Sequence, residues 1–349
     1  MSFYGIIDAY IYDIIEQNVQ NKREELDKML PIGVIGTGHM GRNHVRNLAE
    51  EKCFNLVGIY DSVYDAALKV GKKYGTHAFQ TLEDLLDAVE AVVIAVPSSL
   101  HKEIGLIAAD HGVHALIEKP LATNSEDAKI LSEAFQRKGL TLAVGHIERC
   151  NPVFIELKKI VNPSDIFYIE ARRYSPFVNS GRIGDTSVVE DLMIHDIDLV
   201  CDLMDGISVK SIQGYGEIIQ SDQPDFATCL LKFNSNVHAT IHASRVSQDK
   251  VRKLEVHTKD LCIHADLIAK TLSVSRNTHL VIDQDRDNSY MQDSVIQKIY
   301  VPIQEPLRAE LLMFYDAVGT GKPVLVDGTA GTRAIACCEE VMKQIRQKS

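Results

Sequence analysis

The sequence predicts an α/β fold with a doubly wound parallel sheet in its N-terminal part and an α+β C-terminal part. The second sheet should be large and mostly antiparallel, with one open face. Three observations support this: short apolar and amphipathic runs alternate from residue 32 to 146, the pattern changes after Asn151-Pro152, and residues 209–276 read as strands separated by turns. A chain of 349 residues is long for one core, so we expect two domains, at 31–148 and 149–349.

The N-terminal part reads as a regular alternation of strands and helices. Strands are predicted at 32–35, 55–60, 91–96, 113–117 and 140–144. Helices are predicted at 39–50, 63–74, 81–88, 99–111 and 125–138. Such alternation predicts a parallel sheet covered by helices on both faces, with ligands bound at the carboxyl ends of the strands.

The first predicted strand runs into Gly36-Thr37-Gly38-His39-Met40-Gly41, a G-x-G-x-x-G turn that opens a helix. Gly36 allows the tight turn, Gly38 lets the backbone approach a pyrophosphate, and Gly41 lets the helix pack closely on the strand. Asp61 ends the second predicted strand 20 residues after Gly41 and can accept hydrogen bonds from a ribose. We therefore expect a dinucleotide site, and the lack of an arginine in residues 62–64 favours NAD over NADP.

Two later strand ends are also expected to face the cofactor. Val96-Pro97-Ser98 ends the third predicted strand where a nicotinamide riboside would pass, although a simple strand-to-helix turn would look the same. Ile117-Glu118-Lys119-Pro120 ends the next strand. A lysine in this place would point into the cleft and could orient or deprotonate a substrate hydroxyl. The alternative on these residues alone is a surface lysine in a turn.

The predicted helix Ser187–Met204 carries Asp191, His195 and Asp198 at i, i+4 and i+7, on one face. A histidine with a carboxylate one turn away on each side resembles a general base with an orienting partner. The acidic sequence after it, with Asp196 and Asp198, should raise its proton affinity. A metal pair would need further ligands, so no metal is expected, and a salt-bridged surface helix is the other alternative.

Basic residues could supply a local positive pocket. Arg172 and Arg173 end a predicted strand at 166–173 and precede a polar loop that holds Arg182. Adjacent strand residues point to opposite faces, so only one of the first two can enter the cleft. These arginines could bind a carboxylate or a diphosphate, or they could be solvated surface charge. By contrast, His146, Glu148 and Arg149 are expected to hold the two domains together.

The composition excludes several function classes. A net charge of −11 argues against nucleic-acid and anionic-membrane partners, and no apolar stretch approaches the ~18 residues needed to span a bilayer. Seven scattered cysteines without a C-x-x-C pair predict reduced thiols in a cytoplasmic protein. Residues 1–30 predict an amphipathic extension, docked on the body or on a second subunit.

Taken together, these motifs resemble the glucose–fructose oxidoreductase/inositol dehydrogenase (Gfo/Idh/MocA) family over residues 31–349. The resemblance rests on the ordered set of Gly36–Gly41 with Asp61, Pro97 with His101, Glu118-Lys119-Pro120 and the helix from Asp191 to His195. It implies a Rossmann domain that binds NAD and a second domain whose open sheet face forms homo-oligomer contacts. It also implies that Lys119 and His195 flank the sugar hydroxyl being oxidised, with Asp191 contacting the substrate or the histidine.

Within the family, Gly145–Pro152 and Asp191–Asp198 look like the UDP-N-acetylglucosamine 3-dehydrogenase branch, except that Cys150 stands where members often have Phe. His195 is then the expected base and Lys119 the polarising group, although the two roles could be exchanged. Oxidation of a free sugar or polyol, and a regulator without turnover, are the alternatives. The residues expected to bind cofactor are Gly36, Thr37, Gly38, His39, Met40, Gly41, Asp61, Pro97, Ser98, His101, Glu118 and Lys119. Those expected to bind substrate are Lys119, Arg172, Arg173, Arg182, Asp191 and His195.

Overall fold

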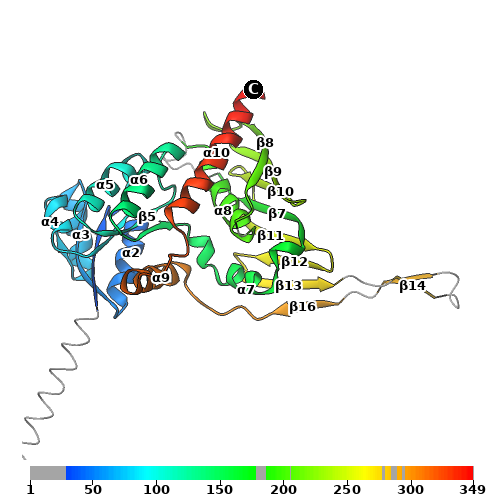
Figure 1. Ribbon diagram of the computed structural model, residues 1–349, viewed down its shortest axis with the longest axis horizontal. Helices are drawn as coiled ribbons and strands as arrows, with labels where there is room; N and C mark the ends of the chain where they lie inside the picture. The colour runs from blue at the N-terminus through cyan, green and yellow to red at the C-terminus, as the bar shows by residue number, and fades with distance from the viewer. Residues whose placement is uncertain are drawn as a thin grey trace, which may run out of the picture.

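A computed structural model describes residues 29–177, 186–204, 206–276, 280–283, 289–292 and 295–348. Two sheets dominate it, one in each half of the molecule (Figure 1). The predicted class, a parallel sheet followed by a mostly antiparallel one, is confirmed. The extension predicted for residues 1–30 lies outside the described residues except at its end, where Leu30 already begins the first strand.

The first sheet has six parallel strands in the order β3-β2-β1-β4-β5-β6. Its strands are β1 (Leu30–Ile35), β2 (Phe54–Tyr60), β3 (His77–Ala78), β4 (Ala91–Ile94), β5 (His114–Glu118) and β6 (Leu142–Gly145). Its helices are α2 (His39–Glu50), α3 (Tyr64–Tyr74), α4 (Leu82–Leu86), α5 (His101–Asp110) and α6 (Ser125–Arg137). The strand order reverses between β1 and β4. The loops after β1, β4 and β5 therefore meet at one edge, where such sheets bind their ligands.

The predicted elements of this half are found with small differences. Strand β3 is not predicted, because two residues are too short to show a periodic pattern. The predicted helix 81–88 is shorter, and it begins as expected, with the Thr81 hydroxyl accepting a hydrogen bond from the Asp84 amide. Strand β4 is buried along its whole length, as expected for a strand covered by helices on both faces.

The second sheet has eight strands in the order β16-β13-β12-β11-β7-β10-β9-β8. All neighbours are antiparallel except β7 and β10. The strands are β7 (Ile166–Tyr174), β8 (Val209–Glu217), β9 (Phe226–Phe233), β10 (His238–Ser244), β11 (Val251–Thr258), β12 (Leu261–Asp266), β13 (Thr271–Arg276) and β16 (Ile296–Ile299). Strands β14 (Leu280–Asp283) and β15 (Ser289–Gln292) pair separately.

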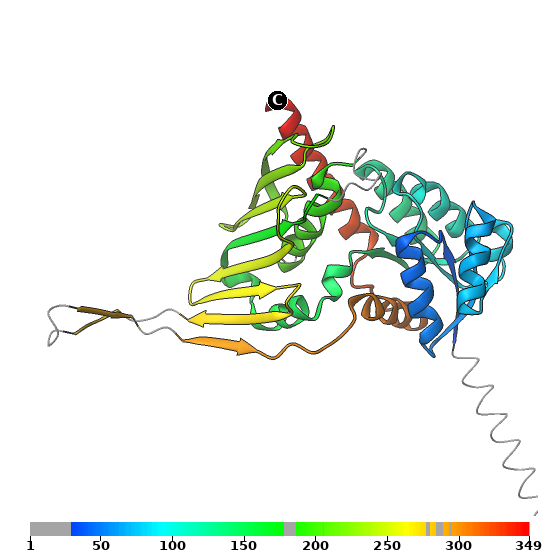
Figure 2. The ribbon, with the colours of Figure 1, turned by 180° about the vertical axis from the view of Figure 1, so that it is seen from behind.

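Within the described ranges, helices cover one face of this second sheet and leave the other open. Helices α8 (Ile194–Leu203) and α10 (Gly328–Lys348) lie across it in Figure 1, and the strands stand in front of them in the view from behind (Figure 2). Helix α7 (Pro152–Ile160) follows the parallel sheet directly. Helix α9 (Pro306–Thr320) returns to the first half, where Leu311 and Phe314 join the core beside β1. The chain thus enters the second half after β6, returns to the first half in α9 and reaches the second sheet again in α10.

Candidate active site

The glycine turn after β1 has the backbone that a dinucleotide requires. Gly36 has φ +91°, and a Cβ built there would lie 2.6 Å from the carbonyl oxygen of Ala95. A Cβ at Gly41 would lie 1.9 Å from the carbonyl oxygen of Gly36. Only glycine fits either position. Gly38 caps α2 without a side chain, which leaves the first-turn N–H groups and the positive end of the helix dipole for an anion.

Asp61, at the end of β2, is fixed over this turn. Its Oδ2 accepts hydrogen bonds from the amide and the hydroxyl of Thr37, both at 2.7 Å, and its Oδ1 accepts one from the amide of Val63 at 3.0 Å. A carboxylate has about four lone-pair sites, so acceptor capacity is left for a ribose. The turn and Asp61 therefore fit a dinucleotide cofactor.

Two buried histidines brace the loop that carries Lys119. The Oε1 atom of Glu118 lies 2.8 Å from Nε2 of His44 on α2. Burial is the largest influence and opposes ionisation of Glu118, but the hydrogen bond to His44 and the nearby positive charges, that of Lys119 among them, together hold the pKa of this carboxyl below its usual value. The ring nitrogens of His101 face two carbonyl oxygens, of Pro120 at 2.7 Å and of Val96 at 3.0 Å.

These contacts change the roles expected of Glu118 and His101. Both are buried, and both use polar side-chain atoms on protein partners. We therefore propose that they position the loops after β4 and β5, next to Pro97 and Lys119, instead of holding the cofactor directly. His44 was missed by the sequence analysis, since one polar residue on the buried face of a helix is an ordinary feature.

Lys119 reaches from the parallel sheet to the second half of the molecule. Its Nζ donates to the backbone oxygen of Asp191 at 2.9 Å and lies 3.3 Å from Asp191 Oδ1. Asp191 belongs to a π-helical turn, η4 (Val189–Met193), that leads directly into α8. The continuous helix predicted for 187–204 is thus interrupted by a wider turn, a feature frequent at functional sites.

His195 stands in the first turn of α8, one turn after Asp191. Its Nδ1 is buried and has no hydrogen-bond partner among the residues that the structure describes. The side chain as a whole is half-buried. The expectation that Asp191 or Asp198 orients this ring is corrected, because Asp191 bonds Lys119 and Asp198 bonds Arg149.

The expectation that acidic neighbours raise the proton affinity of His195 is wrong. Arg173 donates two hydrogen bonds of 2.9 Å to the carboxylate of Asp196, and Arg149 donates hydrogen bonds of 2.7 and 2.5 Å to that of Asp198. Their carboxylate charges are therefore compensated. Burial, followed by the positive charge of Lys119 and of Arg173, holds the pKa of His195 well below its usual value. The ring is neutral at pH 7, as a proton acceptor must be.

The predicted positive pocket is also corrected. The alternation along β7 is as expected, with Arg173 pointing inward and Arg172 outward. Arg173 is 2% exposed and also donates to Glu148 at 2.9 Å, so it is committed to protein partners. Arg172 pairs with Glu255 on the open face of the sheet. Arg182 lies outside the described residues.

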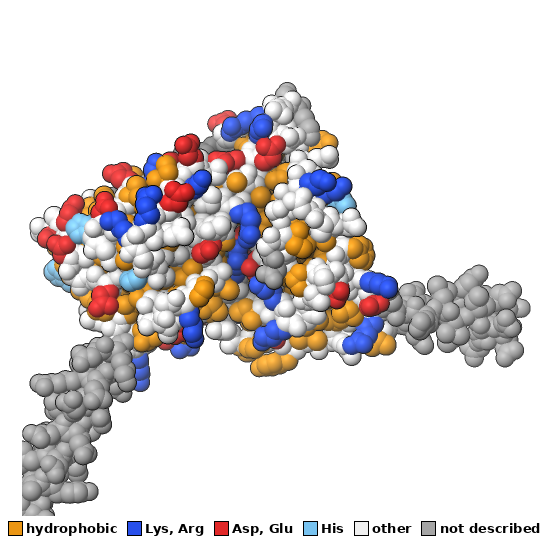
Figure 3. Space-filling view, in the orientation of Figure 1, with side chains coloured by type: hydrophobic (Ala, Val, Ile, Leu, Met, Phe, Trp, Pro, Cys, Tyr) orange, Lys and Arg blue, Asp and Glu red, His pale blue; other side chains and the backbone are white. Residues whose placement is uncertain are grey.

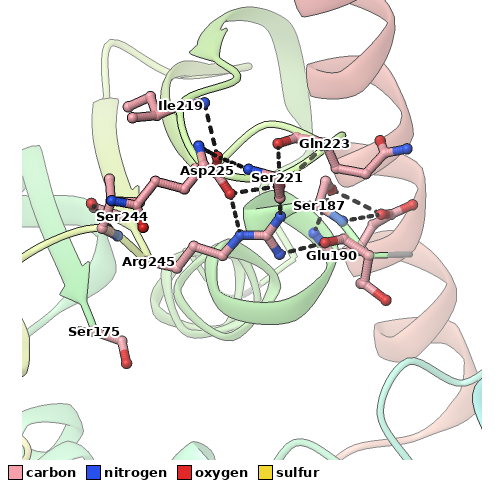
Figure 4. A network of polar contacts seen from close by, with 12 residues as sticks. Ser175, Ser187, Glu190, Ile219, Ser221, Gln223, Asp225, Ser244 and Arg245 are labelled. Atoms are coloured by element: carbon pink, nitrogen blue, oxygen red, sulfur yellow. Dashed lines mark hydrogen bonds and ion pairs between the residues drawn. The ribbon is translucent and has the colours of Figure 1, made fainter. Parts of the chain in front are cut away.

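A second polar network fixes the entry to η4. Arg245 Nε donates to Asp225 Oδ1 at 2.7 Å, and Arg245 Nη1 donates to the backbone oxygen of Thr186 at 2.5 Å (Figure 4). The hydroxyl of Ser187 donates to Glu190 Oε2 at 2.8 Å, which closes a capping arrangement at the helix start. This network joins strands β9 and β10 to the turn that carries Asp191. Thr186, Asp225 and Arg245 lie far apart in sequence and give no local signal, whereas Ser187 and Glu190 follow the local Ser-x-x-Glu capping pattern.

Other classes of site have little support in the structure. Among the described residues no group of three or more His, Cys, Asp or Glu could hold a metal ion. None of the described helices is both long and apolar enough to cross a bilayer. On the face seen in Figure 3, acidic and basic side chains are interspersed, with a short column of basic ones where the two halves meet.

Comparison with known proteins agrees with this geometry. Residues 30–146 match the model of an oxidoreductase family with an NAD-binding Rossmann fold, and residues 165–263 match a GFO/IDH/MocA C-terminal domain. The chain is 32% identical over 312 residues to UDP-N-acetylglucosamine 3-dehydrogenase of Acidithiobacillus ferrooxidans, covering 88% of this chain and 95% of that one. It is 24% identical over 322 residues to the NAD-dependent scyllo-inositol 2-dehydrogenase of Bacillus subtilis, covering 86% and 90%.

A solved structure of the Acidithiobacillus ferrooxidans enzyme superposes with a TM-score of 0.83 at 30% identity, over 91% of this chain and 98% of that chain. A levoglucosan dehydrogenase in complex with NADH and levoglucosan shares the fold, with a TM-score of 0.76 at 18% identity over 92% and 98% of the two chains. The chain therefore belongs to the Gfo/Idh/MocA family of oxidoreductases with an NAD(P)-binding Rossmann fold.

Proposed function

We propose that this protein is an NAD-dependent dehydrogenase that oxidises a sugar hydroxyl to a ketone, with UDP-N-acetylglucosamine giving its UDP-3-keto derivative. The observation that carries the dehydrogenase assignment is the bond from Lys119 to the backbone of Asp191 at 2.9 Å. It brings an ammonium group from the cofactor half against the turn that leads to His195. A cation and a neutral imidazole therefore converge from the two halves of the molecule.

In this mechanism the substrate hydroxyl lies between Lys119 and His195. The ammonium group of Lys119 polarises the hydroxyl oxygen and stabilises the negative charge that develops as the proton leaves. Nε2 of His195 accepts that proton, which the low pKa of the ring permits at neutral pH. Asp191 holds Lys119 in place through its backbone and carboxylate oxygens. The bound nicotinamide supplies the hydride acceptor.

Preference for NAD over NADP is proposed from the end of β2. Asp61 is an anion in the place where the 2′-hydroxyl of the adenosine ribose lies in this fold, and Ser62-Val63-Tyr64 offers no arginine for a 2′-phosphate. Hydrogen bonds from Thr37 and Val63 hold the carboxylate there. The carboxylate would accept from a ribose hydroxyl and repel a phosphate.

The nucleotide-sugar part of the proposal rests on the similarity to the Acidithiobacillus ferrooxidans enzyme along almost its full length. The arginines expected to bind a diphosphate do not support it, since Arg172 and Arg173 are paired with carboxylates. Oxidation of a free polyol is the second candidate. The relative that oxidises scyllo-inositol also matches along most of the chain.

The test is formation of NADH, followed by its absorbance, across UDP-N-acetylglucosamine, other UDP-sugars, N-acetylglucosamine and inositols. We expect turnover with UDP-N-acetylglucosamine and little with the sugar lacking UDP. Turnover confined to free polyols would contradict the UDP-sugar substrate and leave the proposed hydroxyl oxidation in place. Binding of NAD without turnover of any sugar would favour a regulator.

We also propose that the open face of the eight-stranded sheet forms a homo-oligomer. Its outward side chains include the exposed ring of Phe167 and the half-buried Tyr168, Thr240 and His257, a mixed surface suited to contact with a copy of itself. The boundary between the proposed domains at 148/149 then separates cofactor binding from assembly. Mass measurement in solution, repeated with Phe167→Asp, tests this interface.

A further inference from the structure

A buried histidine that the mechanism does not use lies beside His195. His146 follows β6 directly and is 1% exposed. Its ring makes an edge-on contact with the ring of His195, with centroids 6.4 Å apart and planes at 84°. Neither of its nitrogens has a hydrogen-bond partner among the described residues, and the same holds for Nδ1 of His195. Three buried ring nitrogens without partners thus meet at one place.

Such a cluster needs an explanation, because buried polar atoms are nearly always paired and an unpaired one is costly. Substrate contact by His146 itself is disfavoured by its 1% exposure. The ring centroids lie 6.4 Å apart and no direct bond joins the rings, so a polar link between them would need one water with two hydrogen bonds of ~2.8 Å. Both rings are polar enough to hold such a water in place.

The surrounding charges indicate which histidine donates and which accepts in this bridge. Nδ1 of His146 lies 3.8 Å from Asp198 Oδ2, which favours the proton on Nδ1 and leaves Nε2 as the acceptor. The other charged groups that act on the ring are Arg149, Lys119 and Glu118. Those that act on His195 are Lys119, Arg173, His146 and Arg252. Cations thus dominate around His195, so that ring stays neutral. Its single N–H proton can then be on either Nδ1 or Nε2.

We propose that His146 is a positioning residue of the active site. It accepts a water-mediated hydrogen bond from Nδ1–H of His195 and so holds His195 in the tautomer whose Nε2 can take a proton. The inference rests on the proposed role of His195 as the base. When Nε2 takes the hydroxyl proton, the positive charge of the imidazolium is stabilised through the same bridge, and no further proton needs to move.

Two variants separate this role from simple packing. His146→Phe keeps a ring in the same space and removes both ring nitrogens, so the variant should still fold while Nδ1–H of His195 loses its proposed partner. His146→Gln restores an acceptor oxygen without a titratable ring. We expect kcat to fall about tenfold or more in His146→Phe and to recover to within about threefold in His146→Gln, with KM and NAD affinity nearly unchanged.

A second readout does not depend on turnover. Diethyl pyrocarbonate modifies the unprotonated nitrogen of an accessible histidine, and mass spectrometry of the peptide that contains His195 gives the rate in NAD-free protein. We expect modification of His195 at pH 7 to be about three- to tenfold slower in His146→Phe. Without the bridge, His195 can adopt the tautomer whose proton is on Nε2, which the reagent does not modify. The rate should recover in His146→Gln.

The outcomes are distinct. Equal modification rates in wild type and His146→Phe, or equal kcat and pH profiles, would overturn the role of His146. A wild type that oxidises no sugar would overturn the proposed function, and the modification rates would still decide whether His146 acts on His195. Loss of kcat in both variants together with lower stability would show a packing role only and would also overturn the inference.

Discussion

Lys119 and His195 are held in place in two different ways. Lys119 follows β5 directly, and its two chain neighbours are braced close by, Glu118 on His44 and the carbonyl oxygen of Pro120 on His101. His195 sits on a helix whose next turn is held by buried arginines. The strand end is placed by the parallel sheet itself, whereas the helix must be fixed relative to that sheet by charge pairs. Substitution of Lys119 itself should therefore affect chemistry alone, and changes in the charge pairs around His195 should affect chemistry and stability together.

Removing the reacting groups should have the largest effect. Lys119→Ala and His195→Ala should each lower kcat with the best sugar by about 10³-fold, because each removes a group that acts on the hydroxyl proton or its oxygen. NAD affinity, measured by fluorescence titration, should stay within about threefold, since the glycine turn and Asp61 are untouched. Lys129→Ala, at an exposed position on α6, is the matched control. Near wild-type oxidation by either variant would remove that residue from the mechanism.

Breaking one ion pair behind α8 should have the largest effect on stability. Arg173→Met leaves Asp196 buried with an unpaired charge and takes from Glu148 one of its two arginine partners, which should cost about 3–5 kcal/mol in the free energy of unfolding. Arg172→Met, one residue away on the open face, should cost less than about 1 kcal/mol, because its pairs are partly solvated. Urea unfolding compares the two. Equal stabilities would contradict the claim that charge pairs place α8.

The same comparison explains what could be predicted from the sequence. The alternation of strands and helices, the glycine turn and the strand ends are local patterns, and they indicated both the parallel sheet of the first half and the place of Lys119 at a strand end. The partners of Asp196 and Asp198 come from β7 and from the segment after β6, so no spacing along α8 reveals them. The sequence therefore indicated an acidic surrounding for His195, whereas the fold makes it cationic.

Loss of the ribose acceptor should have a moderate effect, confined to the first half of the site. Asp61→Ala removes an acceptor for the ribose and leaves the Thr37 amide unpaired. NAD affinity should fall about tenfold, and the preference for NAD over NADP should shrink because the repulsion of a 2′-phosphate is lost. Titration with both coenzymes measures this, with the exposed Asp65→Ala as control. An unchanged preference would place coenzyme discrimination elsewhere.

The smallest expected effect is a pH dependence of stability that comes from the two neighbouring histidines, His195 and His146. Burial is the main cause that lowers the pKa of His195 and of His146 below the usual value. Between pH 7.5 and 6 the unfolded chain binds protons at these histidines, with pKa near ~6.5, while the folded protein does not, so stability falls as the pH falls. The loss should be about 1 kcal/mol per histidine over this range.

Urea unfolding of wild type and His146→Phe at the two pH values isolates one of the two groups. The variant should lose about half as much stability as the wild type from these residues, since one titrating ring is gone while the other keeps its buried, cationic surrounding. An identical loss in both proteins would mean that His146 takes up its proton as readily in the fold as in the unfolded chain. That result would contradict a neutral His146 beside the proposed base.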